Sequence, residues 1–292
     1  MQLTRKDFTR SVTAFGALGG LGMMRAGKPE PHFLFGICAG PDKAERLKAI
    51  GYDFIEGGVA GTLKPAMPDA AFAPECAKLK TCALPFRSCN GFIPREFRLT
   101  GPAADHGPAL EYAAKACERA DALGIPFIVL GSGGARNVPE GFSTAEGKAQ
   151  FIAFCRKLGD RIRDRNVTIV LEPLNKNESN ILNSVTEGIA YVDEINRPRI
   201  RLLADFYHMM KEKEGPDAIR KAGDRIRHCH IAELEGRKAP GTRDEDLSGY
   251  FMALRDIGYT GGVSCECGWP KENIENAWEK ALATMRRQAG LS

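Results

Sequence analysis

Short apolar runs alternate with longer helical patterns along the chain from about residue 32 to its end. The runs are rich in β-branched and aromatic residues, as strands are, and the segments between them repeat apolar residues at helical intervals of three and four. The expected strands are 33–38, 52–59, 82–89, 126–131, 167–172, 200–205, 226–231 and 262–266. The clearest expected helices are 109–123, 144–163, 185–195, 216–222, 247–257 and 273–288.

Eight strands that each precede a helix predict an α/β fold, a single-domain (β/α)₈ or TIM barrel over residues 29–292. Such a barrel takes about 250 residues, which the chain of 292 residues accommodates. A doubly wound open sheet is the competing layout. No GxGxxG motif follows the first expected strand, and no GxxxxGK[ST] motif occurs, so neither nucleotide-binding loop is expected.

Residues 1–28 have the layout of an export signal, in which a basic segment precedes a short apolar stretch. Thr4 to Phe8 resembles the twin-arginine motif, with Lys6 in place of the second arginine. We therefore expect a periplasmic or otherwise exported protein, the alternative being a cytoplasmic protein with an attached N-terminal extension. No apolar run reaches the ~20 residues of a membrane span.

Net charge and cysteine content exclude two further classes of protein. Residues 1–28 carry five basic side chains and one acidic one, which accounts for the whole formal charge of +4. The remaining chain is neutral, so no nucleic-acid partner is expected. Nine cysteines without a CxxC pair indicate neither a disulfide scaffold nor a structural zinc site. Cys38, Cys229, Cys265 and Cys267 lie in apolar runs and are expected to be buried free thiols.

Four consecutive expected strands end on a residue that can bind a divalent metal, namely Glu172, Asp205, His230 and Glu266. The carboxyl ends of parallel barrel strands meet at one mouth, where the active sites of this fold lie. Any one of these side chains alone is more simply explained as a cap of the following helix, but four in succession favour a metal site. Three carboxylates and one imidazole suit Mn²⁺ best, with Mg²⁺ or Co²⁺ as alternatives.

Two further histidines lie close to this set in sequence. His228 shares a strand face with His230, so we expect it one layer deeper in the barrel as a core histidine. His208 follows Asp205 by three residues, in the loop at the mouth, where it is expected to contact substrate. A divalent cation beside two glutamates is equipped for proton transfer next to a carbonyl group.

The chain resembles the xylose isomerase-like TIM-barrel superfamily, in its branch of sugar phosphate isomerases and epimerases. The resemblance is carried by LEPLNKNESN (171–180), LLADFYHM (202–209), HCHIAE (228–233) and ALRDIGYTGGVSCE (253–266). Among well-understood proteins, it is similar to the D-tagatose/D-psicose 3-epimerases and to hydroxypyruvate isomerase. The resemblance implies that the four strand-end residues bind the metal, and that Glu172 and Glu266 are also the catalytic acid/base pair.

The same resemblance implies substrate-binding roles for His208, Glu178 and Arg237, the last in a segment one residue longer than in the epimerases. Arg136, in GSGGAR (131–136), either meets a substrate phosphate or carboxylate or is a solvated arginine in a glycine-rich loop. Glu56 and Asn90, near the ends of the second and third strands, either contact substrate or a metal ligand or make structural hydrogen bonds.

The expected function is that of a divalent-metal-dependent sugar or sugar-phosphate isomerase or epimerase, working by proton abstraction next to a carbonyl through an enediolate held by the metal. A metal-dependent dehydratase or lyase of a keto-sugar, inosose or keto-glycoside is the alternative on the same barrel. GICAG at the first strand lacks the aromatic residues of the ketose epimerases, which disfavours a plain hexulose.

Two other functions fit the sequence less well. A repair nuclease like endonuclease IV needs many histidines, and this chain has five. A non-catalytic sugar-binding barrel would be expected to have lost ligands, whereas all four are present. The expected partners are a small sugar substrate and, as an open alternative, further copies of the chain.

Overall fold

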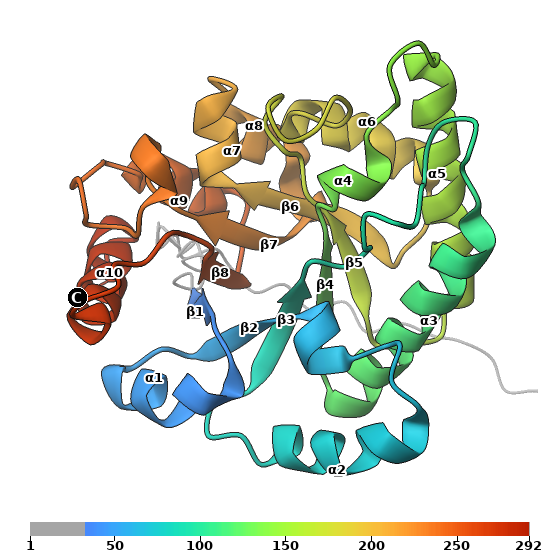
Figure 1. Cartoon of the computed structure of the whole chain (residues 1–292). Coiled ribbons are helices and arrows are strands. Elements are labelled where there is room, and N and C mark those ends of the chain that lie inside the picture. Colours follow the sequence, from blue (N-terminus) through green and yellow to red (C-terminus); the bar gives the residue numbers. More distant parts are fainter. Residues whose placement is uncertain (1–32, 292) are drawn as a thin grey trace, which may run out of the picture. The chain divides into compact units, whose positions relative to one another are not determined.

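Eight parallel strands close into a barrel, in which each strand pairs with its neighbour in sequence and β8 pairs with β1 (Figure 1). The computed structural model describes residues 33–291. The strands are β1 (Leu34–Cys38), β2 (Phe54–Gly58), β3 (Phe86–Asn90), β4 (Phe127–Leu130), β5 (Thr168–Leu171), β6 (Ile200–Asp205), β7 (Ile226–Ile231) and β8 (Gly262–Cys265). This closed parallel order confirms the expected barrel and rules out the open sheet.

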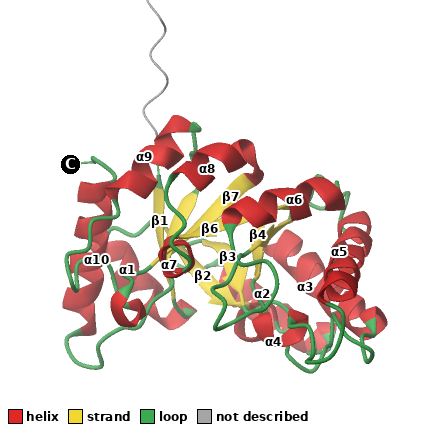
Figure 2. Ribbon diagram, turned by 90° about the horizontal axis from the view of Figure 1, so that it is seen from above, coloured by secondary structure: helices red, strands yellow, loops and turns green. Residues whose placement is uncertain are grey.

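Helices surround the barrel on the outside (Figure 2). They are α1 (Ala44–Ile50), α2 (Asp69–Lys80), α3 (His106–Leu123), α4 (Gly133–Arg136), α5 (Thr144–Arg161), α6 (Val185–Ile195), α7 (Phe206–Lys211), α8 (Asp217–Ala222), α9 (Ser248–Asp256) and α10 (Ile274–Gln288). Short 3₁₀ or π turns occupy Pro41–Lys43, Val59–Leu63, Gly223–Arg225 and Glu235–Arg237. Among the described residues, no helix has the length and apolar character that crossing a bilayer requires. The expected export signal at 1–28 lies outside the described residues.

Several element boundaries differ from the sequence expectation for local reasons. β3 begins at Phe86 and not at residue 82, because Pro85 has no amide hydrogen for a strand ladder and only its carbonyl pairs, with the amide of Ile55. The glycine-rich segment 133–136 forms the short helix α4 and not a loop. β6, β7 and α6 have the expected bounds.

Strand alternation divides the apolar side chains into two cores. The larger core lies between the barrel and the helices, and it includes Cys229 and Cys265, whose thiols are buried as expected. The smaller core lies inside the barrel, where Val129, Val170 and Leu203 from β4, β5 and β6 pack together. All nine cysteines are free, Cys38 and Cys267 being half-buried and not fully buried.

Candidate metal centre

Glu172, Asp205, His230 and Glu266 meet at the carboxyl ends of β5, β6, β7 and β8. One potential ligand atom from each lies within 4.8 Å of the others. Glu172, Asp205 and His230 are buried, and the side chain of Glu266 is 24% exposed, so the group lies just below the surface of the mouth. The structure thus brings together the four residues that the sequence placed at strand ends.

The charges in this group suit a bound cation. His230 Nδ1 lies 3.0 Å from Glu172 Oε1 and 3.3 Å from Glu266 Oε2, so its lone pair or proton faces both carboxylates. Burial raises the pKa of Asp205 to about 6, although His230 and Arg237 oppose the rise. Three carboxylates held this closely in a buried site repel one another, and a divalent cation would remove that repulsion. The donor set therefore fits a hard divalent metal ion.

The two glutamates differ in their affinity for protons. Burial and the neighbouring charge of Glu266 raise the pKa of Glu172. Burial acts in the same direction on Glu266, but His230 and Arg237 outweigh it and lower the pKa of Glu266 to about 2. Two carboxyl groups with separated pKa values at one site are the arrangement that acid/base pairs use.

Asp205 has two roles, one with each carboxylate oxygen. Its Oδ1 accepts a hydrogen bond of 2.8 Å from the amide of Tyr207 and so caps the N-terminus of α7. Its Oδ2 faces Arg237 Nη2 at 3.4 Å and His208 Nε2 at 3.5 Å. The sequence allowed Asp205 to be either a helix cap or a member of a site at the barrel mouth. In the structure Asp205 caps α7 and also lies in the group of four potential ligands.

Arg237 contacts carboxylate side chains of the four-residue group. Its Nη2 donates to Glu266, and its guanidinium lies over the ring of Tyr207 at 4.8 Å. The backbone of Arg237 is left-handed, with φ of 51°. Glu233, which is buried, maintains the loop that carries it by accepting hydrogen bonds from the amides of Gly241 and Arg243.

His208 is held in one tautomer by the segment after β5. The backbone N–H of Asn175 donates to His208 Nδ1 at 3.1 Å, so Nδ1 is an acceptor and the neutral ring carries its proton on Nε2. That Nε2 is buried and has no hydrogen-bond partner among the described residues. Glu178 Oε2 lies 3.9 Å from it, and Asn175 Nδ2 donates to Glu178 Oε1 at 2.9 Å.

Two residues support the glutamates directly. Asn90 Nδ2, at the end of β3, donates to Glu266 Oε1 at 2.9 Å and also lies 3.6 Å from the thiol of Cys38. Gly131, after β4, leaves room for Glu172, since a Cβ there would lie 2.2 Å from Glu172 Oε2. The sequence alone does not single out Gly131, because only the folded chain shows what a Cβ at this position would touch.

Arg136 does not reach the mouth, and it is not solvated either. It is fully buried, and its guanidinium donates to the carbonyl of Glu172 at 2.9 Å, to that of Leu182 at 3.3 Å and to Ser179 Oγ at 3.2 Å. These hydrogen bonds tie the segment after β5 to α4. Arg136 thus supports the backbone that carries Glu172. The expected contact with a substrate phosphate or carboxylate is wrong, because the guanidinium is buried and its nitrogens donate to groups of the protein.

Glu56 is also buried, at 1% exposure, and its carboxylate lies beneath His230. Ser88, which sequence reasoning missed, donates to it at 2.6 Å. The signal for Ser88 was its place two residues before Asn90 on β3, which puts both side chains on one strand face. Asn175 and Glu233 were missed as well, although Asn175 lies within the motif 171–180.

Comparison with known proteins identifies the family. The sequence model of the family described as "Xylose isomerase-like TIM barrel" matches residues 44–288. The chain is 38% identical over 127 residues to L-ribulose 3-epimerase of Methylomonas sp. (strain DH-1), a match that covers 43% of this chain and 44% of that protein. It is 28% identical over 143 residues to 3-dehydro-D-guloside 4-epimerase of Escherichia coli (strain K12), covering 48% and 54%.

Solved structures extend the likeness over the whole barrel. The crystal structure of D-allulose 3-epimerase from Methylomonas sp. in complex with D-allulose superposes with a TM-score of 0.71 and 27% identity, covering 88% of this chain and 98% of that one. The sequence matches span about half the length or less of the curated relatives. What those relatives act on therefore bears on this chain only as a proposal.

Proposed function

The chain belongs to the xylose isomerase-like TIM barrel family, and from that premise we propose that it is a divalent-metal-dependent isomerase or epimerase of a ketose or keto-sugar. The observation that carries the proposal is the meeting of Glu172, Asp205, His230 and Glu266 at the mouth of the barrel. Relatives named as ketose 3-epimerases support the same class of reaction.

Glu172, Asp205, His230 and Glu266 would hold the metal, and their three carboxylates favour Mn²⁺, with Mg²⁺ or Co²⁺ as alternatives. When bound, such a cation polarises the carbonyl and neighbouring hydroxyl oxygens of a ketose and stabilises the enediolate that forms when a proton leaves the adjacent carbon. His230 adds a neutral nitrogen to the set, which keeps the net charge of the ligands at −3 and not −4.

Glu172 and Glu266 would move the proton. Glu172 has the raised pKa and retains a proton more readily, whereas Glu266 is held ionised by His230 and Arg237 and can accept one. Removal of the substrate proton by one carboxylate, and delivery of the proton held by the other carboxyl group to the opposite face, gives the epimer and exchanges the protonation states of the two glutamates. Return to the neighbouring carbon gives an aldose–ketose isomer.

His208, Glu178, Arg237 and Asn90 would hold the substrate oxygens. The proton on His208 Nε2 is directed toward Asp205 and Glu178 and has no hydrogen-bond partner in the described part of the chain, so it is available for a substrate oxygen. Glu178 is 40% exposed and can accept from a hydroxyl group. This division gives one donor for a carbonyl oxygen and one acceptor for a hydroxyl.

A glycoside of a keto-sugar is the substrate class that we propose to test beside free ketoses. β1 ends in Cys38, followed by Ala39 and Gly40, with no aromatic side chain to cover a free hexulose. The similarity to a protein named 3-dehydro-D-guloside 4-epimerase points in the same direction.

The test is an NMR assay in D₂O, in which the Mn²⁺-loaded protein meets ketoses, keto-glycosides, inososes and their phosphates, and the substrates are examined after removal of the protein and metal. Deuterium at the carbon next to the carbonyl, together with an epimer or isomer, is the expected result. Exchange accompanied by elimination would instead make the protein a lyase. No exchange with any substrate, although the metal is bound, would contradict the proposal.

Export through the segment 1–28 is proposed separately, from the sequence alone. The test is cell fractionation of the full-length protein beside a variant with Arg5 and Lys6 both changed to Gln. The wild-type protein is expected in the periplasm and the variant in the cytoplasm. A wild-type protein that stays in the cytoplasm would contradict export.

A further inference from the structure

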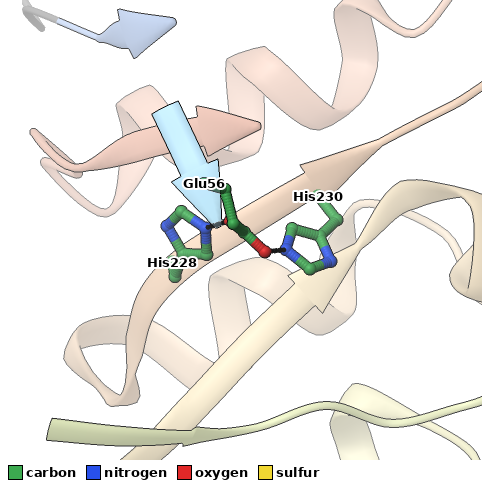
Figure 3. A group of neighbouring side chains, drawn as sticks. All are labelled: Glu56, His228 and His230. Carbon is green, nitrogen blue, oxygen red and sulfur yellow. Dashed lines mark hydrogen bonds and ion pairs between the residues drawn. The ribbon is translucent and has the colours of Figure 1, made fainter. Parts of the chain in front are cut away.

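A second cluster of titratable side chains lies one layer below the candidate metal centre, inside the barrel. It consists of Glu56 from β2 with His228 and His230 from β7 (Figure 3). Glu56 Oε2 lies 2.7 Å from His228 Nε2, and Glu56 Oε1 lies 2.8 Å from His230 Nε2. Each of the three residues is 1% exposed or less, so water does not compete for these hydrogen bonds.

The three contacts of Glu56 determine where the protons are. A carboxylate only accepts hydrogen bonds, so its partners must all donate. Ser88 Oγ donates to Oε2 at 2.6 Å, and each histidine must present a protonated Nε2. A neutral His230 with its proton on Nε2 has a free lone pair on Nδ1, the atom that faces Glu172 and Glu266.

The cluster is a hydrogen-bonded array and not a second metal site. Its nitrogen–oxygen separations of 2.7 and 2.8 Å are ordinary hydrogen-bond lengths. Ligand atoms that surround one cation at about 2.1 Å stand roughly 3 Å or more apart. A cation bound to His230 Nε2 would also repel the divalent cation that we propose to bind at Nδ1 of the same ring, beside Glu172 and Glu266.

We propose that Glu56 is a positioning residue for the metal centre, which fixes the Nε2–H tautomer and the ring orientation of His230 so that Nδ1 presents its lone pair to the metal. Ser88 and His228 in turn fix Glu56. The inference rests on the proposed metal site. Outer partners of this kind hold metal-bound histidines in many proteins, and their loss typically weakens metal binding about 10–100-fold.

The decisive variant is Glu56→Gln, which keeps the shape of the side chain. Glutamine offers one oxygen and one NH₂ group where the carboxylate offered two acceptors. One of the two histidines therefore faces a donor, and it must lose its hydrogen bond or move its proton to Nδ1. Metal affinity is expected to fall about 10–100-fold. Glu187→Gln is the matched control, because Glu187 is a carboxylate bonded to Lys148 and the Asn183 amide, away from the cluster.

Calorimetric titration with Mn²⁺ of the wild type, Glu56→Gln and Glu187→Gln measures the effect. The control is expected to bind as the wild type does. Equal affinity in the wild type and Glu56→Gln would overturn the role of Glu56 and leave the metal site standing. A wild-type protein that binds no divalent cation would overturn the proposed metal site itself, and the role of Glu56 with it.

A second measurement keeps the inference testable if Glu56→Gln fails to fold. Long-range ¹H–¹⁵N NMR spectra of the histidine rings report the tautomer directly in wild-type protein loaded with diamagnetic Zn²⁺. The expected spectrum shows His228 and His230 both protonated at Nε2. A His230 ring protonated at Nδ1 would overturn the inference. The measurement separates the proposed role from a purely structural role of Glu56, because a structural role would not require His230 to be protonated at Nε2.

Discussion

The four candidate metal ligands stand on two different kinds of support. Beneath Glu172 and Asp205, two residues earlier in the chain, lie Val170 and Leu203, which belong to the small apolar core inside the barrel. Beneath His230 and Glu266, by the same step of two, lie His228 and Ser264, which are buried polar residues. Strand alternation places each pair on one face, so the residue directly beneath the ligand is apolar for Glu172 and Asp205 and polar for His230 and Glu266.

The difference teaches what each ligand needs from its support. A carboxylate can bind a cation with either oxygen, so packing that holds its backbone in place is sufficient for Glu172 and Asp205. An imidazole binds through one nitrogen only, and the other nitrogen must carry the proton. His230 therefore stands above Glu56, which accepts that proton, and the rings of Phe54 and Phe127 pack against His228 in the same layer.

The largest expected effect comes from a carboxylate on the apolar side. Glu172→Gln keeps the volume of the side chain but removes the negative charge of a metal ligand and one of the two groups that transfer the proton. Deuterium exchange into a substrate of the wild type should slow by about 10²–10⁴-fold, the contribution of general acid–base catalysis. The same NMR assay measures it, with Glu187→Gln as the control. Exchange at close to the wild-type rate would remove Glu172 from the mechanism.

Truncation of the apolar support should affect stability more than metal binding. Leu203→Ala removes a fully buried side chain from the inner core, which should lower the free energy of unfolding by about 2–5 kcal/mol. Urea denaturation of the metal-free protein measures this loss, and calorimetry measures Mn²⁺ affinity. If Leu203→Ala weakened metal binding as much as Glu56→Gln does, the proposed difference between the apolar support of Asp205 and the polar support of His230 would be wrong.

Gly131→Ala tests whether the position of the Glu172 carboxylate matters by itself. The new Cβ would lie 2.2 Å from Glu172 Oε2, the mobile end of a side chain, so the carboxylate should move aside while the fold persists. Mn²⁺ affinity should fall on the order of tenfold, at the lower end of the losses that follow from poorly supported ligands. Gly61→Ala, whose Cβ would meet nothing within 4 Å, is the control. Equal affinity in both variants would show that Glu172 tolerates the shift.

Protons should compete with the metal at the acidic end of the pH range. The pKa of Asp205 is raised to about 6, mainly by burial, so below that pH its carboxyl group is increasingly protonated and must lose the proton when a cation binds. Mn²⁺ affinity should therefore fall about fivefold from pH 6 to pH 5 through Asp205 alone. Burial lowers the pKa of His230, but the charges of Glu56 and Glu266 outweigh burial and raise that pKa, so His230 also loses a proton when the metal binds and the affinity should continue to rise above pH 6. Calorimetry in two buffers of different ionisation enthalpy counts the protons released. A Mn²⁺ affinity that stays constant from pH 6 to pH 5, with no proton released on binding, would contradict the raised pKa of Asp205.

Much of the site was predictable because strand parity and strand ends are local properties of a sequence. The ends of β5 to β8 could be found from apolar runs that close on a charged residue or histidine, and parallel strands then bring those ends together. His228 was expected below His230 for the same reason, and it lies there. Arg136 shows the limit, since its motif suggested an exposed loop and the folded chain buries it under α4 and the segment after β5.

The sequence by itself determined the barrel, its eight strands and the four residues at its mouth, because hydrophobic periodicity and the residue at each strand end are written along the chain. Only the tertiary structure decided which side chains form hydrogen bonds with those four residues. Glu56 and His230 are separated by 174 positions, and Asn90 and Glu266 by 176, and their pairing follows from closure of β1 onto β8. A hydrogen bond across the barrel depends on register and on the length of each side chain, and no local pattern records either.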